Sequence, residues 1–175
     1  SQWIIFLGKD DSQDIEMRLF QLRKRIEKRI RENTKNAVGD CEFYFASLSS
    51  KTVVYKGMVR SEVLSEFYDD LKKEDFKVSF SVYHRRFSTN TLPKWPLAQP
   101  MRFLGHNGEI NTLLGNIHWA KASERHIDEY WGELSKDIKP IVDINKSDSS
   151  NLDATLEINI RSGKPITDSL LKLVP

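Results

Sequence analysis

Several features that would identify a protein class are scarce in this sequence. Cys41 is its single cysteine, so an internal disulfide or a zinc site made of several thiolates is excluded. No apolar run approaches the roughly 20 residues that span a bilayer, and the first residues lack the basic leader of a signal peptide. Its 27 basic and 25 acidic residues nearly balance, which gives no broad electrostatic case for nucleic acid. We therefore expect no membrane and no nucleic acid among its partners.

A metal site is not expected either. The histidines His84, His106, His118 and His126 are irregularly spaced and form no His-x-x-x-His pair, which is the spacing that places two ligands on one helix face. His84 and His106 are expected to hold loops through hydrogen bonds. Cys41 lacks the local signature of a catalytic cysteine and precedes an apolar segment, so we expect a buried or edge thiol.

The chain has the length of one domain or of a piece of one. It begins without methionine, opens inside an apolar run and stops at Pro175. We interpret residues 1–175 as a single partial domain cut from something longer.

Hydrophobic periodicity predicts helices separated by groups of short strands. Ile15, Leu19, Leu22, Ile26 and Ile30 recur at helical spacing, which predicts a helix that ends near residues 33–36. The Arg and Lys residues between them are expected to form a solvated face. Further helices are expected over 61–71, 112–123, 125–136, 149–160 and 170–173, and strands over 4–7, 43–48, 52–56, 78–82 and 101–105, with 138–144 either strand or irregular.

The segment 91–100 is expected to be an ordered loop. Pro93, Pro96 and Pro100 exclude a helix and an interior strand, and Trp95 is expected to pack the loop. The expected helices and strands do not alternate in a βαβα order, which favours the α+β class.

Arg86 is the first candidate binding residue. It follows the alternating segment 78–82, and a guanidinium at the end of a strand can hold a carboxylate with two parallel hydrogen bonds. An isolated arginine there is more often part of a surface ion pair. Thr89 and Asn90 could bind the same carboxylate, although forming a turn is their ordinary role.

Asn107 and Gly108 are the second candidate group. An Asn-Gly pair is the commonest signal of a hairpin turn. Here a predicted strand precedes the pair and a predicted helix follows it, which favours a different role. The Asn107 amide and the Gly108 backbone N–H could together stabilise an oxyanion, where the loss of one donor costs about 3 kcal/mol of barrier.

Asp148 lies among serines ahead of a predicted helix. One reading is a helix-capping cluster, worth about 1 kcal/mol, with Ser149 or Ser150 as the cap. The other is a carboxylate that pairs with the α-ammonium of an amino acid. This segment alone favours the cap.

These residues together resemble a known family. The stretches that carry the likeness are Tyr83–Thr91, Trp95–Pro100 and His106–Asn116, supported by 23–28, 47–57, 147–153 and 173–175. They are similar to the class II glutamine amidotransferase domain of glutamate synthase large subunits. The likeness covers nearly the whole chain, and the proline-rich insert at 95–100 makes it specific.

The resemblance implies a fold and a set of roles. The fold is the N-terminal-nucleophile hydrolase fold, a four-layer αββα sandwich with two antiparallel sheets, here incomplete. Arg86 would bind the α-carboxylate of glutamine with Thr89 or Asn90, Asn107 and Gly108 would form the oxyanion hole, and Asp148 would hold the α-ammonium.

The family's activity and partners follow from the same resemblance. Glutamine is hydrolysed to glutamate and ammonia through a γ-glutamyl thioester, and the ammonia aminates 2-oxoglutarate reductively at a flavin. FMN and an iron–sulfur cluster are implied for the full-length enzyme and none for this segment. The implied partners are glutamine, the remainder of the synthase, and ferredoxin or NAD(P)H as electron donor. The implied location is the cytoplasm, or the plastid stroma in a photosynthetic eukaryote.

The sequence departs from the family at the nucleophile, which is a cysteine with a free α-amino group. Ser1 stands at the first position and Cys41 is internal, so the isolated chain is expected to lack turnover. Two alternatives stay open: a non-catalytic module or partner subunit that binds glutamine or glutamate, and a scaffold that binds nucleic acid through the basic helix near residues 18–31.

Overall fold

A computed structural model describes residues 14–34, 43–85, 94–108, 110, 112–144 and 146–174. The predicted strand at 4–7 and Cys41 lie outside these ranges. In chain order the elements are α1 (Ile15–Thr34), η1 (Ser61–Val63), α2 (Leu64–Phe67), η2 (Asp69–Lys72), η3 (Trp95–Leu97), α3 (Leu113–Trp131), η4 (Gly132–Leu134), α4 (Ser135–Ile138), α5 (Asp148–Arg161) and α6 (Ile166–Leu173), where η marks a 3₁₀ helix.

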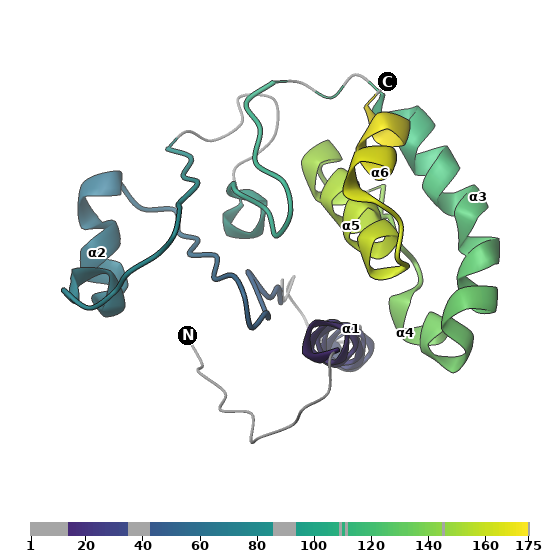
Figure 1. Cartoon of the computed structure of the whole chain (residues 1–175), viewed down its shortest axis with the longest axis horizontal. Coiled ribbons are helices and arrows are strands. Elements are labelled where there is room, and N and C mark those ends of the chain that lie inside the picture. The colour runs from purple at the N-terminus through teal and green to yellow at the C-terminus, as the bar shows by residue number, and fades with distance from the viewer. Residues whose placement is uncertain are drawn as a thin grey trace.

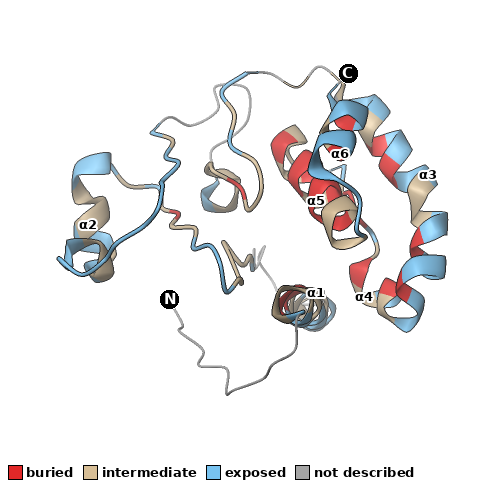
Figure 2. Ribbon diagram, in the orientation of Figure 1, coloured by how far each residue is buried: buried red, intermediate tan, exposed pale blue. Residues whose placement is uncertain are grey.

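The helices α1, α3, α4, α5 and α6 pack together in one part of the molecule (Figure 1). Helix α5 contacts both α3 and α6, and α4 contacts both α1 and α3. Figure 2 shows the buried residues concentrated on α5 and on the sides of α3 and α4 that face it. The main core consists of Phe20, Ile117, Ala120, Ile127, Trp131, Ile138, Ile141, Val142 and Ile158. A second cluster joins α5 to α6 through Leu152, Leu156 and Leu173.

The predicted bounds of the first helix are confirmed by α1, but its buried face differs from the prediction. Leu22 is 43% exposed, whereas Phe20 and Arg23 are buried. The Phe20 ring packs against Trp131, with 5.6 Å between the centroids, and Arg23 pairs with Glu157 of α5. The expectation that all basic residues of this helix lie on a solvated face is therefore wrong at Arg23. This side chain is buried because it pairs with Glu157, which is distant in the sequence.

The predicted α+β class and αββα sandwich are wrong for the described residues, which contain helices and irregular segments and no β-strand. A strand requires that its backbone groups pair with another strand, and in 43–56 side chains occupy several of them. The Val54 N–H donates to Ser47 Oγ at 3.0 Å. The Phe45 carbonyl accepts from Arg102 at 2.6 Å. These bonds take the place of strand-to-strand bonds, so the predicted strands 43–48 and 52–56 are irregular.

The predicted strand at 78–82 is missing for a different reason. Its alternating apolar residues Val78, Phe80 and Val82 are all exposed, so no surface covers the face that the alternation was expected to bury. The predicted strand at 101–105 is a turn, in which the Met101 N–H donates to the Leu104 carbonyl at 2.7 Å.

The other predicted helices are recovered with changed boundaries. Residues 113–131 of the predicted helices 112–123 and 125–136 form the single helix α3, and 132–136 fall in η4 and α4. Helix α3 ends where Gly132 has a φ of 52°, and this left-handed backbone suits glycine. The predicted helix 61–71 is divided among η1, α2 and η2. The proline-rich segment contains the 3₁₀ turn η3, and Trp95 packs on Tyr44 with 5.8 Å between the ring centroids. Over the described ranges, none of the helices combines the length and the apolarity that crossing a membrane requires.

Candidate functional site

The N-terminus of α5 positions Asp148. Ser147 is the N-cap of this helix, because its Oγ accepts from the Ser150 N–H at 3.2 Å. The expected cap at Ser149 or Ser150 is therefore wrong. Asp148 is the first helical residue, and its Oδ1 accepts from the Ser149 N–H at 2.6 Å. Asp148 thus belongs to the capping cluster, as the segment alone indicated, with one carboxylate oxygen engaged by its neighbour.

His106 connects the Asn107–Gly108 segment to the same helix end. Its Nδ1 lies 2.8 Å from the Gly108 carbonyl oxygen, and its Nε2 lies 2.7 Å from Ser149 Oγ. The His106 N–H also donates to Gln99 Oε1 at 2.9 Å. The expectation that His106 holds a loop by hydrogen bonds is confirmed, and through Ser149 the loop reaches the residue next to Asp148.

These contacts fix the tautomer of a neutral His106. A carbonyl oxygen can only accept, so Nδ1 must carry the proton that goes to Gly108. Nε2 is then the acceptor, and the Ser149 hydroxyl donates to it. Ser149 Oγ also lies 3.1 Å from Asp148 Oδ1, so this carboxylate oxygen competes with Nε2 for the single hydroxyl proton of Ser149, while the Ser149 N–H donates to Asp148 alone.

Asn107 is oriented by His84. His84 Nε2 lies 3.1 Å from Asn107 Oδ1, and a neutral amide oxygen accepts, so the imidazole donates. This bond uses the oxygen of the Asn107 amide and does not use its Nδ2 donor. A Cβ built at Gly108 would meet no heavy atom within 4 Å. Both residues are exposed, so a reacting group can approach them.

The structure thus brings Asn107, Gly108 and Asp148 to one place, linked by His106 and Ser149. Arg86, Thr89 and Asn90 lie outside the described residues. The void that borders Asp148 has a volume of about 10 Å³, enough for about one water molecule and too small for an amino acid.

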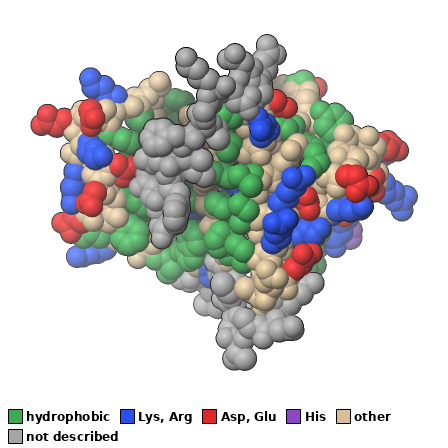
Figure 3. Space-filling view, turned by 90° about the horizontal axis from the view of Figure 1, so that it is seen from below, with side chains coloured by type: hydrophobic (Ala, Val, Ile, Leu, Met, Phe, Trp, Pro, Cys, Tyr) green, Lys and Arg blue, Asp and Glu red, His purple; other side chains and the backbone are tan. Residues whose placement is uncertain are grey.

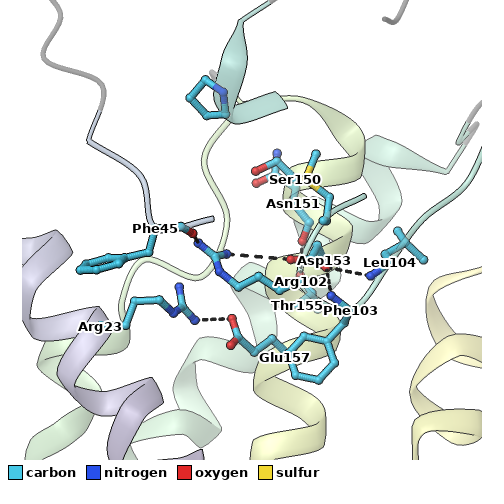
Figure 4. Close-up of polar contacts among 12 residues, drawn as sticks. Arg23, Phe45, Arg102, Phe103, Leu104, Ser150, Asn151, Asp153, Thr155 and Glu157 are labelled. Carbon is cyan, nitrogen blue, oxygen red and sulfur yellow. Dashed lines mark hydrogen bonds and ion pairs between the residues drawn. The ribbon is translucent and has the colours of Figure 1, made fainter. Parts of the chain in front are cut away.

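A buried ionic cluster holds α5 against α1 and the 101–104 turn (Figure 4). Arg23 of α1 pairs with Glu157 and, at 3.3 Å, with Glu27. Arg102 lies 3.4 Å from Glu27 and 3.9 Å from Asp153. Burial raises the pKa of Glu27, but the charges of Arg23 and Arg102 outweigh it and leave the pKa lowered.

Asp153 is the acceptor that holds the 101–104 turn. Its Oδ1 accepts from the Phe103 N–H at 2.8 Å and from the Leu104 N–H at 3.1 Å. Burial raises the pKa of Asp153, although these backbone donors and Arg102 act in the opposite direction. Its role follows from these bonds: it positions the turn that leads to His106.

No cofactor or metal site can be assigned on this segment. Within the described ranges no three His, Cys, Asp or Glu residues are grouped closely enough to hold a metal ion. An iron–sulfur cluster needs several thiolates, and the sequence has one cysteine. The residues present therefore do not fit the iron–sulfur cluster implied for the full-length enzyme.

Sequence reasoning missed two parts of this arrangement. Ser149 was considered as a cap and not as the partner of His106, which lies 43 positions away. The pair Arg23–Glu157 spans 134 positions. No local pattern predicts contacts across such separations. Periodicity indicates which face of a helix or strand a residue lies on, but not which residues pack against that face.

Comparison with known proteins gives the family. The model of the family Glutamine amidotransferases class-II matches residues 1–175, the whole chain. The chain therefore belongs to the class II glutamine amidotransferases.

Curated relatives are consistent with this family. The ferredoxin-dependent glutamate synthase of Pyropia yezoensis is 52% identical over 162 residues, which is 92% of this chain and 10% of that protein. The chloroplastic ferredoxin-dependent glutamate synthase of Oryza sativa subsp. japonica is 50% identical over 95% of this chain and 10% of its own length. Ferredoxin-dependent glutamate synthase 2, chloroplastic, of Arabidopsis thaliana is 49% identical over 99% of this chain and 11% of its own length. The chain spans about a tenth of the length of the relatives it matches.

Proposed function

We propose that residues 1–175 are the glutamine-binding part of an amidotransferase domain within a ferredoxin-dependent glutamate synthase. That enzyme hydrolyses glutamine to glutamate and ammonia and uses the ammonia to aminate 2-oxoglutarate. One observation carries the proposal: in a chain matched by the family over its full length, His106 joins the Gly108 carbonyl to Ser149, beside Asp148.

The proposed roles follow from the chemistry of each group. Asp148 is an acceptor for the α-ammonium of glutamine. Asn107, whose Nδ2 is not used by His84, and the Gly108 N–H are donors for the oxyanion that forms when the side-chain amide is attacked. Arg86 binds the α-carboxylate, assisted by Thr89 or Asn90, because a guanidinium offers two parallel donors.

The covalent step requires a nucleophile that these residues do not supply. A cysteine sulfur attacks the amide carbon of glutamine, ammonia leaves, and water then releases glutamate from the γ-glutamyl thioester. The base in this family is the free α-amino group of that cysteine. The α-nitrogen of Cys41 is part of a peptide bond, so Cys41 cannot use it as a base. A polypeptide of these 175 residues alone is therefore expected to bind glutamine weakly and not to turn it over.

The remaining partners belong to the longer protein. Relatives named ferredoxin-dependent support ferredoxin as the electron donor over NAD(P)H. FMN would belong to the synthase portion, as would the iron–sulfur cluster. The chloroplastic names of two relatives support a plastid stroma if the source is a photosynthetic eukaryote, and the cytoplasm otherwise.

Calorimetry and a glutaminase assay on the purified 175-residue polypeptide test this proposal. We expect weak heat of binding with L-glutamine, less with D-glutamine, and no ammonia above background. A glutaminase rate that Cys41→Ala abolishes would overturn the assignment of the nucleophile to another part of the protein. Micromolar binding of L-glutamine without turnover would instead support a stand-alone binding module.

A further inference from the structure

A cavity of about 440 Å³ borders α1 and α5, and Asn151 lines both this cavity and the void beside Asp148. The walls of the cavity come from α1, from the segments 94–102 and 140–147, and from the face of α5 that carries Ser150, Ala154 and Glu157. Asp148, Asn107 and Gly108 do not line it. A volume of this size is typical of small-molecule sites, which run from about 300 to 1,000 Å³.

The side chains that line this cavity carry an excess of positive charge. Six of them are Lys or Arg and three are Asp or Glu, so the formal excess is three positive charges. Lys and Arg side chains also gather beside a band of hydrophobic side chains on the molecular face seen in Figure 3. Two of the three carboxylates are already neutralised, because Glu27 pairs with Arg23 and Arg102, and Glu157 pairs with Arg23.

Lys24 and Lys146 are two of the cations that this pairing leaves uncompensated, and Arg31 is a third. Among the described residues, neither lysine forms an ion pair within 4.0 Å, and Lys24 lies over the Phe20 ring at 5.7 Å from its centroid. Burial and the neighbouring Arg23 lower the pKa of Lys24 to about 8. Burial and Arg31 also lower the pKa of Lys146. In both cases burial is the larger cause, and a neighbouring arginine acts in the same direction.

We propose that this cavity binds a small anion with at least two negatively charged oxygen groups, such as a phosphorylated metabolite or a dicarboxylate. Lys24 and Lys146 would pair with the charges, and the Ser150 hydroxyl at the cavity wall would add a hydrogen bond. A multivalent anion is favoured over a monovalent one because several cations line one cavity, and charge-assisted hydrogen bonds are stronger than neutral ones. The site is separate from the candidate glutamine site and does not depend on the function proposed for it.

The test is calorimetric titration of the 175-residue polypeptide with inorganic pyrophosphate and, separately, with succinate, at constant ionic strength set with sodium chloride. We expect one equivalent of at least one probe to bind. Pyrophosphate alone would identify a phosphorylated ligand, and succinate alone a dicarboxylate; either supports the site. Binding of neither would overturn the proposal.

Matched lysine variants locate the binding. The double variant Lys24→Met with Lys146→Met should weaken binding at least about ten-fold, because it removes two charge-assisted contacts. The control is Lys121→Met with Lys172→Met, which removes the same charge from positions that do not line the cavity and should change the affinity less than about two-fold. Equal losses in both variants would show non-specific charge attraction and overturn the proposal.

Two further measurements work on the unmodified chain and do not require that the variants fold. Bound pyrophosphate or succinate should protect Lys24 from acetylation by acetic anhydride more than it protects Lys121, as read by mass spectrometry. Equal protection would contradict the proposal. L-Glutamine should not displace the bound anion; displacement would place the anion at the candidate glutamine site and contradict a separate cavity site.

Discussion

At the scale of single residues, the hydrogen bonds of His84 and His106 determine which groups near Asn107 and Gly108 remain available. His84 uses the Asn107 oxygen, and His106 uses the Gly108 carbonyl. Both bonds use an oxygen acceptor, and the Asn107 Nδ2 and the Gly108 N–H are not used by either of them. The proposed oxyanion site requires donors of this kind. If the proposed oxyanion site is formed by Asn107 and Gly108, these two imidazoles would help to hold its donors in place before the reaction.

Asn107→Ala tests the donor role in the longer amidotransferase that contains this segment. We expect the glutaminase kcat to fall by about 10²–10³ with a small change in KM, since the oxyanion exists only in the transition state. Asn33→Ala, at an exposed position of α1, is the matched control and should leave kcat unchanged. A loss that appears in KM alone would assign Asn107 to ground-state binding instead.

Lys56 provides a pH-dependent test of folding at the same scale. It is buried, and its ammonium donates to the Pro96 carbonyl at 3.0 Å. Burial lowers its pKa from 10.5 to about 8, with Arg102 acting in the same direction. Between these values the unfolded chain binds more protons than the folded one, so the free energy of unfolding rises with pH.

From pH 8 to about 9.5 the free energy of unfolding should therefore increase, by on the order of 1 kcal/mol per pH unit for each such lysine. The range stops there because burial raises the pKa of Tyr44 above its ordinary 10.0, and that group contributes with opposite sign at higher pH. Lys56→Met should reduce the slope, and Lys51→Met, at an exposed position, should not. Urea unfolding at several pH values measures both; equal slopes in the two variants would contradict the assignment.

At the scale of elements, α5 organises the described structure. Leu152 and Leu156 pack against Leu173 of α6. Asp153 binds the 101–104 turn, and Glu157 pairs with Arg23 of α1. The first turn of α5 bears Asp148 and Ser149. A single helix therefore connects the hydrophobic core to the candidate site. Substitutions that remove its polar contacts should affect both the stability of the core and the geometry of the site.

Asp153→Ala should lower the free energy of unfolding by roughly 2–4 kcal/mol, because two backbone N–H groups lose their acceptor and Arg102 loses a countercharge. Asp153→Asn should cost less, since an amide oxygen can still accept and burial of a carboxylate is avoided. Asp75→Ala, at an exposed position, is the control, with a change below about 0.5 kcal/mol. Denaturant unfolding measures all three; an Asp153→Ala effect as small as the control would show that the turn is held by other contacts.

The elements also show what the sequence could and could not predict. Helix α1 was predicted with accurate bounds, because helical periodicity and the end of its apolar stripe are local properties. The strands at 43–56 and 78–82 were predicted from alternation, but a strand also needs a partner with free backbone groups, and alternation carries no information about that partner. For the site, the sequence indicated Asn107, Gly108 and Asp148 but not Ser149, whose partner His106 is distant along the chain.

At the scale of the whole molecule, the apolar surface is divided unequally. The helices α1, α3, α5 and α6 contribute most of the buried core residues, whereas the segment 64–85 contributes none (Figure 2) and exposes several large apolar side chains. Phe80 is 77% exposed and Tyr83 is 79% exposed. Neighbouring apolar side chains exposed to this degree are typical of surfaces that contact another protein or self-associate.

The 175-residue polypeptide should therefore self-associate as its concentration rises, with residues 76–83 as the contact. Phe80 and Val82 are two positions apart in extended chain, which places them on one side. The double variant Phe80→Lys with Val82→Lys should shift the chain toward the monomer, because it removes apolar area and adds like charges. Sedimentation velocity over a range of concentrations measures this, with Leu171→Lys and Val174→Lys as a control at exposed positions outside the segment. A chain that is monomeric at every concentration, or an equal shift in both variants, would show that the exposed segment does not mediate association.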